Sequence, residues 1–122
     1  MNVKNRNKLL LPSVARIATT NSPDIGNLGA SGVHIIIDVT AVTATPSVVP
    51  TVQAKDPVSG EYYTLLVGAA ITATGTTVLK VFPSATAVAN LAANDIVPEL
   101  FRILMTHGDA DSITYSVSAN LV

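Results

Sequence analysis

Two stretches of sequence decide the fold: residues 32–42 read GVHIIIDVTAV, and residues 47–66 read SVVPTVQAKDPVSGEYYTLL. In the first stretch, apolar residues at positions 33, 35, 37 and 39 alternate with mostly polar residues. Successive side chains of a β-strand point to opposite faces, so this alternation predicts a strand with one face in a hydrophobic core. In the second stretch, DPVSG at 56–60 separates two β-branched or aromatic runs, which is typical of a hairpin turn. Together the two stretches predict an all-β protein.

The same pattern extends outward along the chain. Strands are predicted over residues 9–20, 33–42, 47–55, 61–67, 78–82, 99–107 and 112–119, with a bend at Pro12 in the first. An alanine-rich stretch at residues 84–94 predicts one short helical turn. About seven short strands separated by turn signals indicate an antiparallel β-sandwich, immunoglobulin-like in its broad plan. The cysteine pair and the core tryptophan of antibody domains are absent from the sequence.

Length and composition narrow the class of protein further. The 122 residues suit a single domain, which we expect over residues 9–122. Cysteine is absent, which excludes disulfides and thiolate metal sites. Charged residues make up only 12% of the chain, which indicates either a surface buried in an assembly or a Thr/Ser-rich soluble domain. The net charge of -1 gives no general attraction to nucleic acid or anionic lipid, and no apolar run approaches the ~20 residues that cross a membrane. We therefore expect neither nucleic acid nor membrane as a partner.

The beginning of the chain is basic. Lys4, Arg6 and Lys8 are interleaved with asparagines, and no hydrophobic period precedes the leucines at 9–11. Residues 1–8 are therefore interpreted as an N-terminal arm that a partner orders, with a frayed terminus as the alternative. The three basic residues are the candidate partner-binding residues. Basic residues before leucines also occur in secretory signals, but Pro12 and Arg16 interrupt the apolar segment, so no such signal is expected.

Candidate catalytic residues are few. His34 and His107 are the two histidines, and no serine lies in a Gly-x-Ser-x-Gly motif. Asp38 with Asp95 or Glu99 would provide an acid/base pair of the glycosidase kind, but the sequence does not bring them together. We expect no enzymatic activity and no catalytic residues.

Two loops have the composition of ligand sites. Asp109 and Asp111 are the best metal candidates, but calcium needs six or more oxygen ligands, and a hairpin turn also explains both residues. Gly26, Gly29 and Gly32 have a spacing related to dinucleotide loops, yet a strand follows them where such a loop needs a helix. We expect neither a metal site nor a cofactor site.

Several segments together resemble a known family. They are GVHIIIDVTA at 32–41, TPSVVPTVQ at 45–53, KDPVSGEYYTLL at 55–66 and DSITYSVSA at 111–119. These segments resemble short proteins encoded among the virion genes of tailed bacteriophages, and the likeness runs from about Leu11 to the end. The resemblance implies a virion structural protein assembled in the host bacterial cytoplasm. Within that class it implies a capsid decoration or cement protein that self-associates and binds the major capsid protein.

Two alternatives to capsid decoration stay open. One is a tail, neck or fibre-associated structural protein, which composition does not distinguish from a decoration protein. The other is a carbohydrate-binding β-sandwich for host attachment, in which sugars stack on exposed aromatic rings. Tyr62 and Tyr63 are neighbours in a predicted strand and so point to opposite faces, which leaves one of them outward.

Overall fold

Alternation decides which side of each strand enters the core. The strand predicted over residues 33–42 forms with those bounds as β4 (Val33–Val42) in the computed structural model, which describes residues 6–27 and 29–121. Ile35 and Ile37 are fully buried, whereas Asp38 and Thr40 are exposed. The period of two therefore places one face of β4 against a core and the other in solvent.

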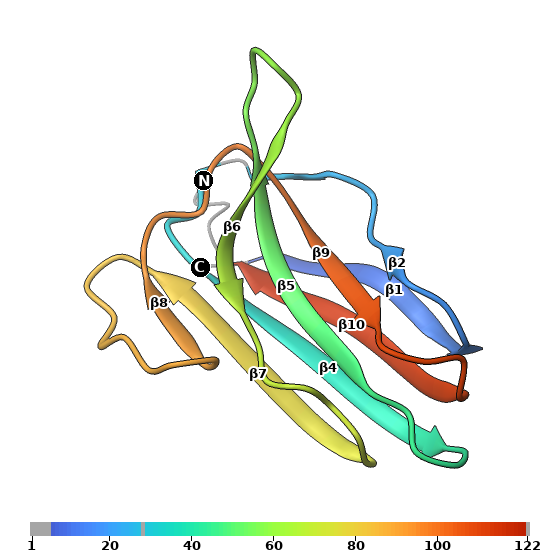
Figure 1. Ribbon diagram of the computed structural model, residues 1–122. Coiled ribbons are helices and arrows are strands. Elements are labelled where there is room, and N and C mark those ends of the chain that lie inside the picture. The colour runs from blue at the N-terminus through green and yellow to red at the C-terminus, as the bar shows by residue number, and fades with distance from the viewer. Residues whose placement is uncertain (1–5, 28, 122) are drawn as a thin grey trace.

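Two sheets pack against each other, and Figure 1 shows them as the two layers of a sandwich. Sheet A has the order β1 (Arg6–Arg16), β10 (Ile113–Leu121), β4, β7 (Gly75–Phe82) and β8 (Ala92–Asn94). Sheet B has the order β2 (Thr20–Asn21), β9 (Leu100–His107), β5 (Val48–Lys55) and β6 (Tyr62–Val67), with β3 (Ile25–Gly26) also paired to β9. All pairings are antiparallel except that of β7 with β8. The predicted antiparallel β-sandwich is confirmed.

The core lies between the two sheets and contains side chains of both. The largest side chains with no exposed surface, or almost none, are Tyr115, Phe101, Ile35, Ile37, Leu79, Ile103, Met105, Ile113 and Leu121. Burying one such side chain contributes roughly 1.5–3 kcal/mol relative to leaving it in water. Packing of this kind accounts for a stable fold in a chain without cysteine.

The strand order differs from the immunoglobulin plan that we expected. In that plan the first and last strands lie in different sheets, whereas here β1 and β10 are hydrogen-bonded neighbours. With β2 and β3 taken as one interrupted strand, the orders β1-β10-β4-β7 and β2/β3-β9-β5-β6 are those of a jelly roll. Alternation reports which face of a strand is buried but not which strands are neighbours, so the sequence predicted the sandwich without this order.

The helical turn predicted over residues 84–94 is not present. Ser84 and Asn90 have φ angles of 70° and 64°, which a right-handed helix does not allow. The Asn94 side chain accepts the Ser84 N–H at 2.9 Å, and residues 92–94 pair with β7. A short alanine-rich segment with mostly exposed side chains buries too little apolar surface to offset the cost of starting a helix.

The beginning of the sandwich also differs from the expected boundary at residue 9. Strand β1 starts at Arg6, where Arg6 pairs with Leu121 and Lys8 with Ala119. Backbone pairing to β10 extends the strand here, and the side chain of Lys8 is exposed. Because the strand is extended here by backbone pairing, residues 6–8 lack the alternation of apolar residues by which a strand is predicted. Within the described residues, no helix is long and apolar enough to span a membrane.

Candidate functional site

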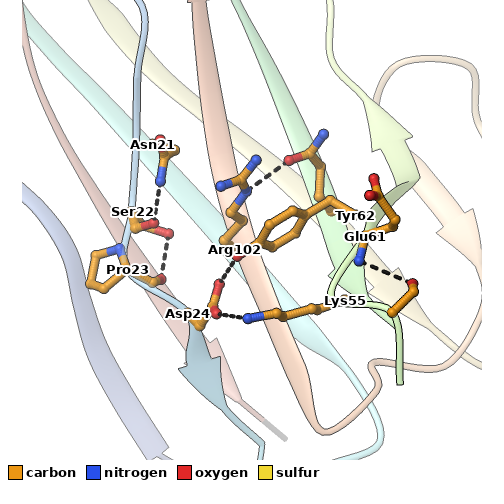
Figure 2. Close-up of polar contacts among 10 residues, drawn as sticks. Asn21, Ser22, Pro23, Asp24, Lys55, Glu61, Tyr62 and Arg102 are labelled. Carbon is orange, nitrogen blue, oxygen red and sulfur yellow. Dashed lines mark hydrogen bonds and ion pairs between the residues drawn. The ribbon is translucent and has the colours of Figure 1, made fainter. Parts of the chain in front are cut away.

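The outward face of sheet B carries a connected group of polar side chains. Alternation buries Val52 and Ala54 in β5, so Gln53 and Lys55 point away from the core. The register then places Tyr62 of β6 opposite Lys55, and Arg102 of β9 opposite Gln53. Figure 2 shows Lys55, Tyr62 and Arg102 together with Asp24, which lies between β2 and β3. We call Asp24, Gln53, Lys55, Tyr62 and Arg102 the Tyr62 cluster.

Arg102 is held in place from two directions. Its guanidinium carbon lies 3.5 Å from the centroid of the Tyr62 ring, which is close stacking of a cation on an aromatic face. Its Nε–H donates to the side-chain oxygen of Gln53 at 2.9 Å. Its Nη1 and Nη2 groups have no hydrogen-bond or ion-pair partner among the described residues. The guanidinium is thus oriented by the fold while its outer edge stays available.

Asp24 anchors the other side of the cluster. The Tyr62 hydroxyl donates to Asp24 Oδ1 at 2.6 Å, and Lys55 Nζ lies 2.9 Å from Asp24 Oδ2. These two hydrogen bonds, that of Tyr62 first, hold the pKa of Asp24 below its ordinary value. Asp24 in turn raises the pKa of Lys55. The carboxylate therefore stays ionised, and it holds the hydroxyl end of the Tyr62 ring on which Arg102 stacks.

Apolar side chains lie beside this polar group on the same face. One row across sheet B consists of Leu104 in β9, Thr51 in β5 and Val67 in β6, which are paired in register. Val67 is 42% exposed and Leu104 is partly exposed, while Thr51 is almost buried between them. Arginine and tyrosine next to apolar side chains are the residue types enriched at protein–protein interfaces. This face of sheet B therefore has the composition of a docking surface.

The hairpin between β5 and β6 extends beyond the rest of the sandwich (Figure 1). Its turn is rigid because Asp56 accepts the backbone N–H of Val58 and the hydroxyl of Ser59, each at 2.9 Å. The hydrogen bond from the Val58 N–H is the main cause of a lowered pKa at Asp56. Val58 at the tip is 94% exposed. The backbone of the turn is thus held by side-chain hydrogen bonds, and an apolar side chain is exposed at its tip.

A second arginine stacks on a tyrosine within sheet A. The guanidinium carbon of Arg16 lies 4.6 Å from the ring centroid of Tyr115, whose side chain is fully buried. Burial raises the pKa of Tyr115 to about 12, and its hydroxyl lies 2.9 Å from Nε2 of His107. Arg16 donates to the carbonyl oxygens of Tyr115 at 2.7 Å and of Pro12 at 2.6 Å. These groups satisfy one another and stabilise the fold.

The predicted partner-binding residues do not join the Tyr62 cluster. Arg6 and Lys8 belong to β1 at the edge of sheet A, and Lys4 lies outside the described residues. Their proposed role in partner binding stays a prediction.

The weaker candidates for chemistry have structural partners. The Asp109 side chain accepts the backbone N–H of Asp111 at 3.0 Å, and the Asp111 side chain accepts that of Thr45 at 3.1 Å. Among the described residues, no three His, Asp or Glu side chains form a group that could hold a metal ion. His34 lies in sheet A and His107 in sheet B, at the end of β9.

One glycine of the glycine-rich loop, Gly32, is explained by packing. A Cβ added at Gly32 would lie 2.4 Å from Cβ of Phe82, so only glycine allows this close approach of the loop to β7. A cavity of about 340 Å³ opens next to this contact, lined by Gly32, Val33, His34, Phe82, Pro83 and Ser31. Packing against β7 thus explains the glycine at position 32.

Sequence reasoning missed most of the Tyr62 cluster. Alternation places Gln53 and Lys55 on one face, and this signal was present in the sequence. The contacts of Tyr62 with Asp24 and of Gln53 with Arg102 join residues 38 and 49 positions apart, so they depend on the register between strands. Comparisons give no further guidance: no protein-family model, curated protein or solved structure matches this chain.

Proposed function

We propose that this protein is a structural component of a tailed-phage particle, a capsid decoration protein that docks through the outward face of sheet B. The observation that carries the proposal is the orientation of Arg102 on Tyr62 next to the apolar row of Leu104 and Val67. A rigid arginine–tyrosine pair beside partly exposed apolar side chains suits the centre of a protein interface, where few residues provide most of the binding energy.

Two further observations support this proposal. The sequence segments at 32–41, 45–53, 55–66 and 111–119 resemble phage virion proteins. The strand order is that of a jelly roll, an architecture that also occurs in viral capsid proteins. The second argument is an analogy of fold, and it supports the class of protein without naming the partner. Many copies on one shell would let a modest affinity at each site suffice, because assembly is multivalent.

The test is cosedimentation with heads of the phage that encodes the protein, assembled without it. We expect hundreds of bound copies per head by quantitative gel densitometry. About a dozen copies or fewer would instead favour a tail, neck or fibre-associated place in the particle. Absence of binding to the whole particle would contradict the proposal.

A pair of valine variants tests which face docks. Val67 in sheet B and Val14 in β1 are 42% and 47% exposed, so replacing either with glutamate is matched in chemistry and exposure. We expect Val67→Glu to reduce head binding at least roughly tenfold, since a charge would enter the apolar row without a partner. Val14→Glu should bind as the unaltered protein does. The reverse result would move the docking surface to β1, where Arg6 and Lys8 lie.

A carbohydrate-binding function is the alternative that one observation favours. Tyr63, on the opposite side of β6 from Tyr62, is 49% exposed, whereas one face of the Tyr62 ring is covered by Arg102. An exposed ring of this kind can stack on a sugar. Binding on a glycan array that Tyr63→Ala abolishes would favour this alternative over decoration.

A further inference from the structure

We infer that the free edge of the Arg102 guanidinium binds a carboxylate, supplied by an aspartate or glutamate side chain of the protein on which this chain docks. The inference rests on the proposed function and specifies the chemistry of the partner. Its basis is the state of the guanidinium: Nε is bonded to Gln53, and Nη1 and Nη2 have no partner among the described residues. A guanidinium edge with two donors matches the two oxygens of a carboxylate.

The site is organised before any ligand arrives. Lys55 and Tyr62 both bond to Asp24, which fixes the Tyr62 ring, and Arg102 stacks on that ring at 3.5 Å. The hydrogen bond to Gln53 fixes rotation of the guanidinium within its own plane. Ordering a free arginine side chain at an interface costs binding free energy, and here the fold has already met that cost. A flexible surface lysine such as Lys80 has no comparable support in the described structure, where its side chain is exposed.

The charges of the Tyr62 cluster leave a net positive charge at Arg102. Asp24 is close enough that Arg102 contributes to lowering the pKa of its carboxyl group. Lys55 forms the ion pair with Asp24, whereas Arg102 forms no ion pair among the described residues. One charge is thus available, and one carboxylate matches it.

The surroundings favour a protein as the source of the carboxylate. Leu104 and Val67 lie along the same face and would be covered by apolar side chains of a partner. Excluding water from this row would also strengthen the pairing of Arg102 with an acid at its edge.

Head binding of two charge variants provides the first test. Arg102→Gln removes the charge and the donor pair, while the matched control Lys80→Gln removes an exposed cation from sheet A. We expect Arg102→Gln to weaken head binding at least roughly tenfold and Lys80→Gln to leave it unchanged. Arg102→Lys should recover only part of the loss, because a lysine cannot present two donors in one plane. Equal head binding by the unaltered protein and Arg102→Gln would overturn the inference and leave the proposed function standing.

A second test addresses the site without phage heads. The ¹⁵N NMR signal of the Arg102 Nε–H is followed while the full chain is titrated with acetyl-Gly-Glu-Gly-amide, acetyl-Gly-Gln-Gly-amide or inorganic phosphate. The glutamate peptide should shift the signal with saturation and should compete with phosphate for the same edge, whereas the glutamine peptide should do neither. A signal that ignores the glutamate peptide would overturn the carboxylate assignment. Because this readout needs no heads, it tests the site even if the protein fails to bind them.

Discussion

The described residues include two arginine–tyrosine pairs, one in each sheet, and they differ in what surrounds the guanidinium. Arg16 lies over Tyr115 and donates to backbone carbonyls of its own fold. Arg102 lies over Tyr62, with Nε bonded to Gln53 and its outer edge without a partner among the described residues. The same two residue types therefore stabilise the fold in one sheet and present a binding group in the other.

Backbone irregularity explains the difference. The pairing of β1 with β10 shifts register between Leu9 and Leu11 and again between Leu11 and Val14. Pro12 lies in the second irregular stretch, outside the register, and its carbonyl accepts a hydrogen bond from Arg16. Around Arg102 the pairing of β5 with β9 has no register shift from Val48 to Ala54, so the backbone carbonyls there accept hydrogen bonds between the strands. A guanidinium above a regular ladder finds few acceptors beneath it.

The largest expected effect is on the Arg16 pair. Arg16→Ala leaves the carbonyl groups of Pro12 and Tyr115 without the donor at 2.6–2.7 Å and removes the stacking on Tyr115. We expect a loss of about 2–3 kcal/mol in the free energy of unfolding, because hydrogen bonds from charged donors are among the stronger ones. Thermal unfolding followed by circular dichroism should show a Tm lower by roughly 10 °C. An unchanged Tm would mean that the bulged β1 needs no support from Arg16.

The hydroxyl group of Tyr115 should contribute more to the stability of the fold than that of Tyr62. Tyr115→Phe removes the hydroxyl that bonds to His107 inside the core, at an expected cost of about 1 kcal/mol. Tyr62→Phe removes the bond to Asp24 on a solvent-facing surface, and its expected cost is about 0.5 kcal/mol or less. Urea unfolding of both variants measures the two losses in the free energy of unfolding. A larger loss of stability for Tyr62→Phe than for Tyr115→Phe would contradict the assignment of the structural role to the pair in sheet A.

His107, which lies within hydrogen-bond distance of the Tyr115 hydroxyl, should also give the protein a pH dependence. Burial, with a smaller contribution from Arg16, lowers the pKa of His107 below 6.5, and Asp109 opposes this shift. As the pH falls through 6.5 the unfolded chain therefore takes up the proton before the folded one, so stability present above pH 6.5 is lost below it. The imidazole is partly exposed, which keeps the loss below about 1 kcal/mol. Urea midpoints at pH 7.5 and 5.5 should differ less in His107→Gln than in the unaltered protein, and an equal difference would contradict this origin.

Alternation predicted the parts of the fold that depend on one strand at a time. The bounds of β4 were predicted to the residue, and β5, β6 and β9 differ from prediction by one residue at their starts. Strands β2, β3 and β8 have two or three residues each, too few to show a period. The helical turn at 84–94 was wrong because alanine content indicates a local preference, and the segment meets its backbone needs through Asn94 and β7 instead.

The candidate site was beyond the reach of such patterns for a related reason. The arm carrying Lys4, Arg6 and Lys8 was predicted to bind a partner because its basic residues lie close together in the sequence. The Tyr62 cluster draws residues from β5, β6, β9 and the segment before β3, and no one of these segments is unusual by itself. Arg16 likewise contacts Tyr115, which lies 99 positions away. Strand pairing creates both arginine–tyrosine pairs, and the sequence predicted strands without their partners.

The smallest expected effect concerns the stability of the Arg102 pair. Arg102→Gln removes one solvent-facing hydrogen bond and one cation–π contact, which together contribute about 0.5 kcal/mol or less after screening by water. The Tm of this variant should therefore lie within roughly 2 °C of the unaltered protein, even though its binding is expected to fall. Differential scanning calorimetry of Arg102→Gln and Arg16→Ala in one buffer makes the comparison direct. If Arg102→Gln lost as much stability as Arg16→Ala, both arginines would stabilise the fold. The free edge of Arg102 would then no longer distinguish a binding site from a packing contact.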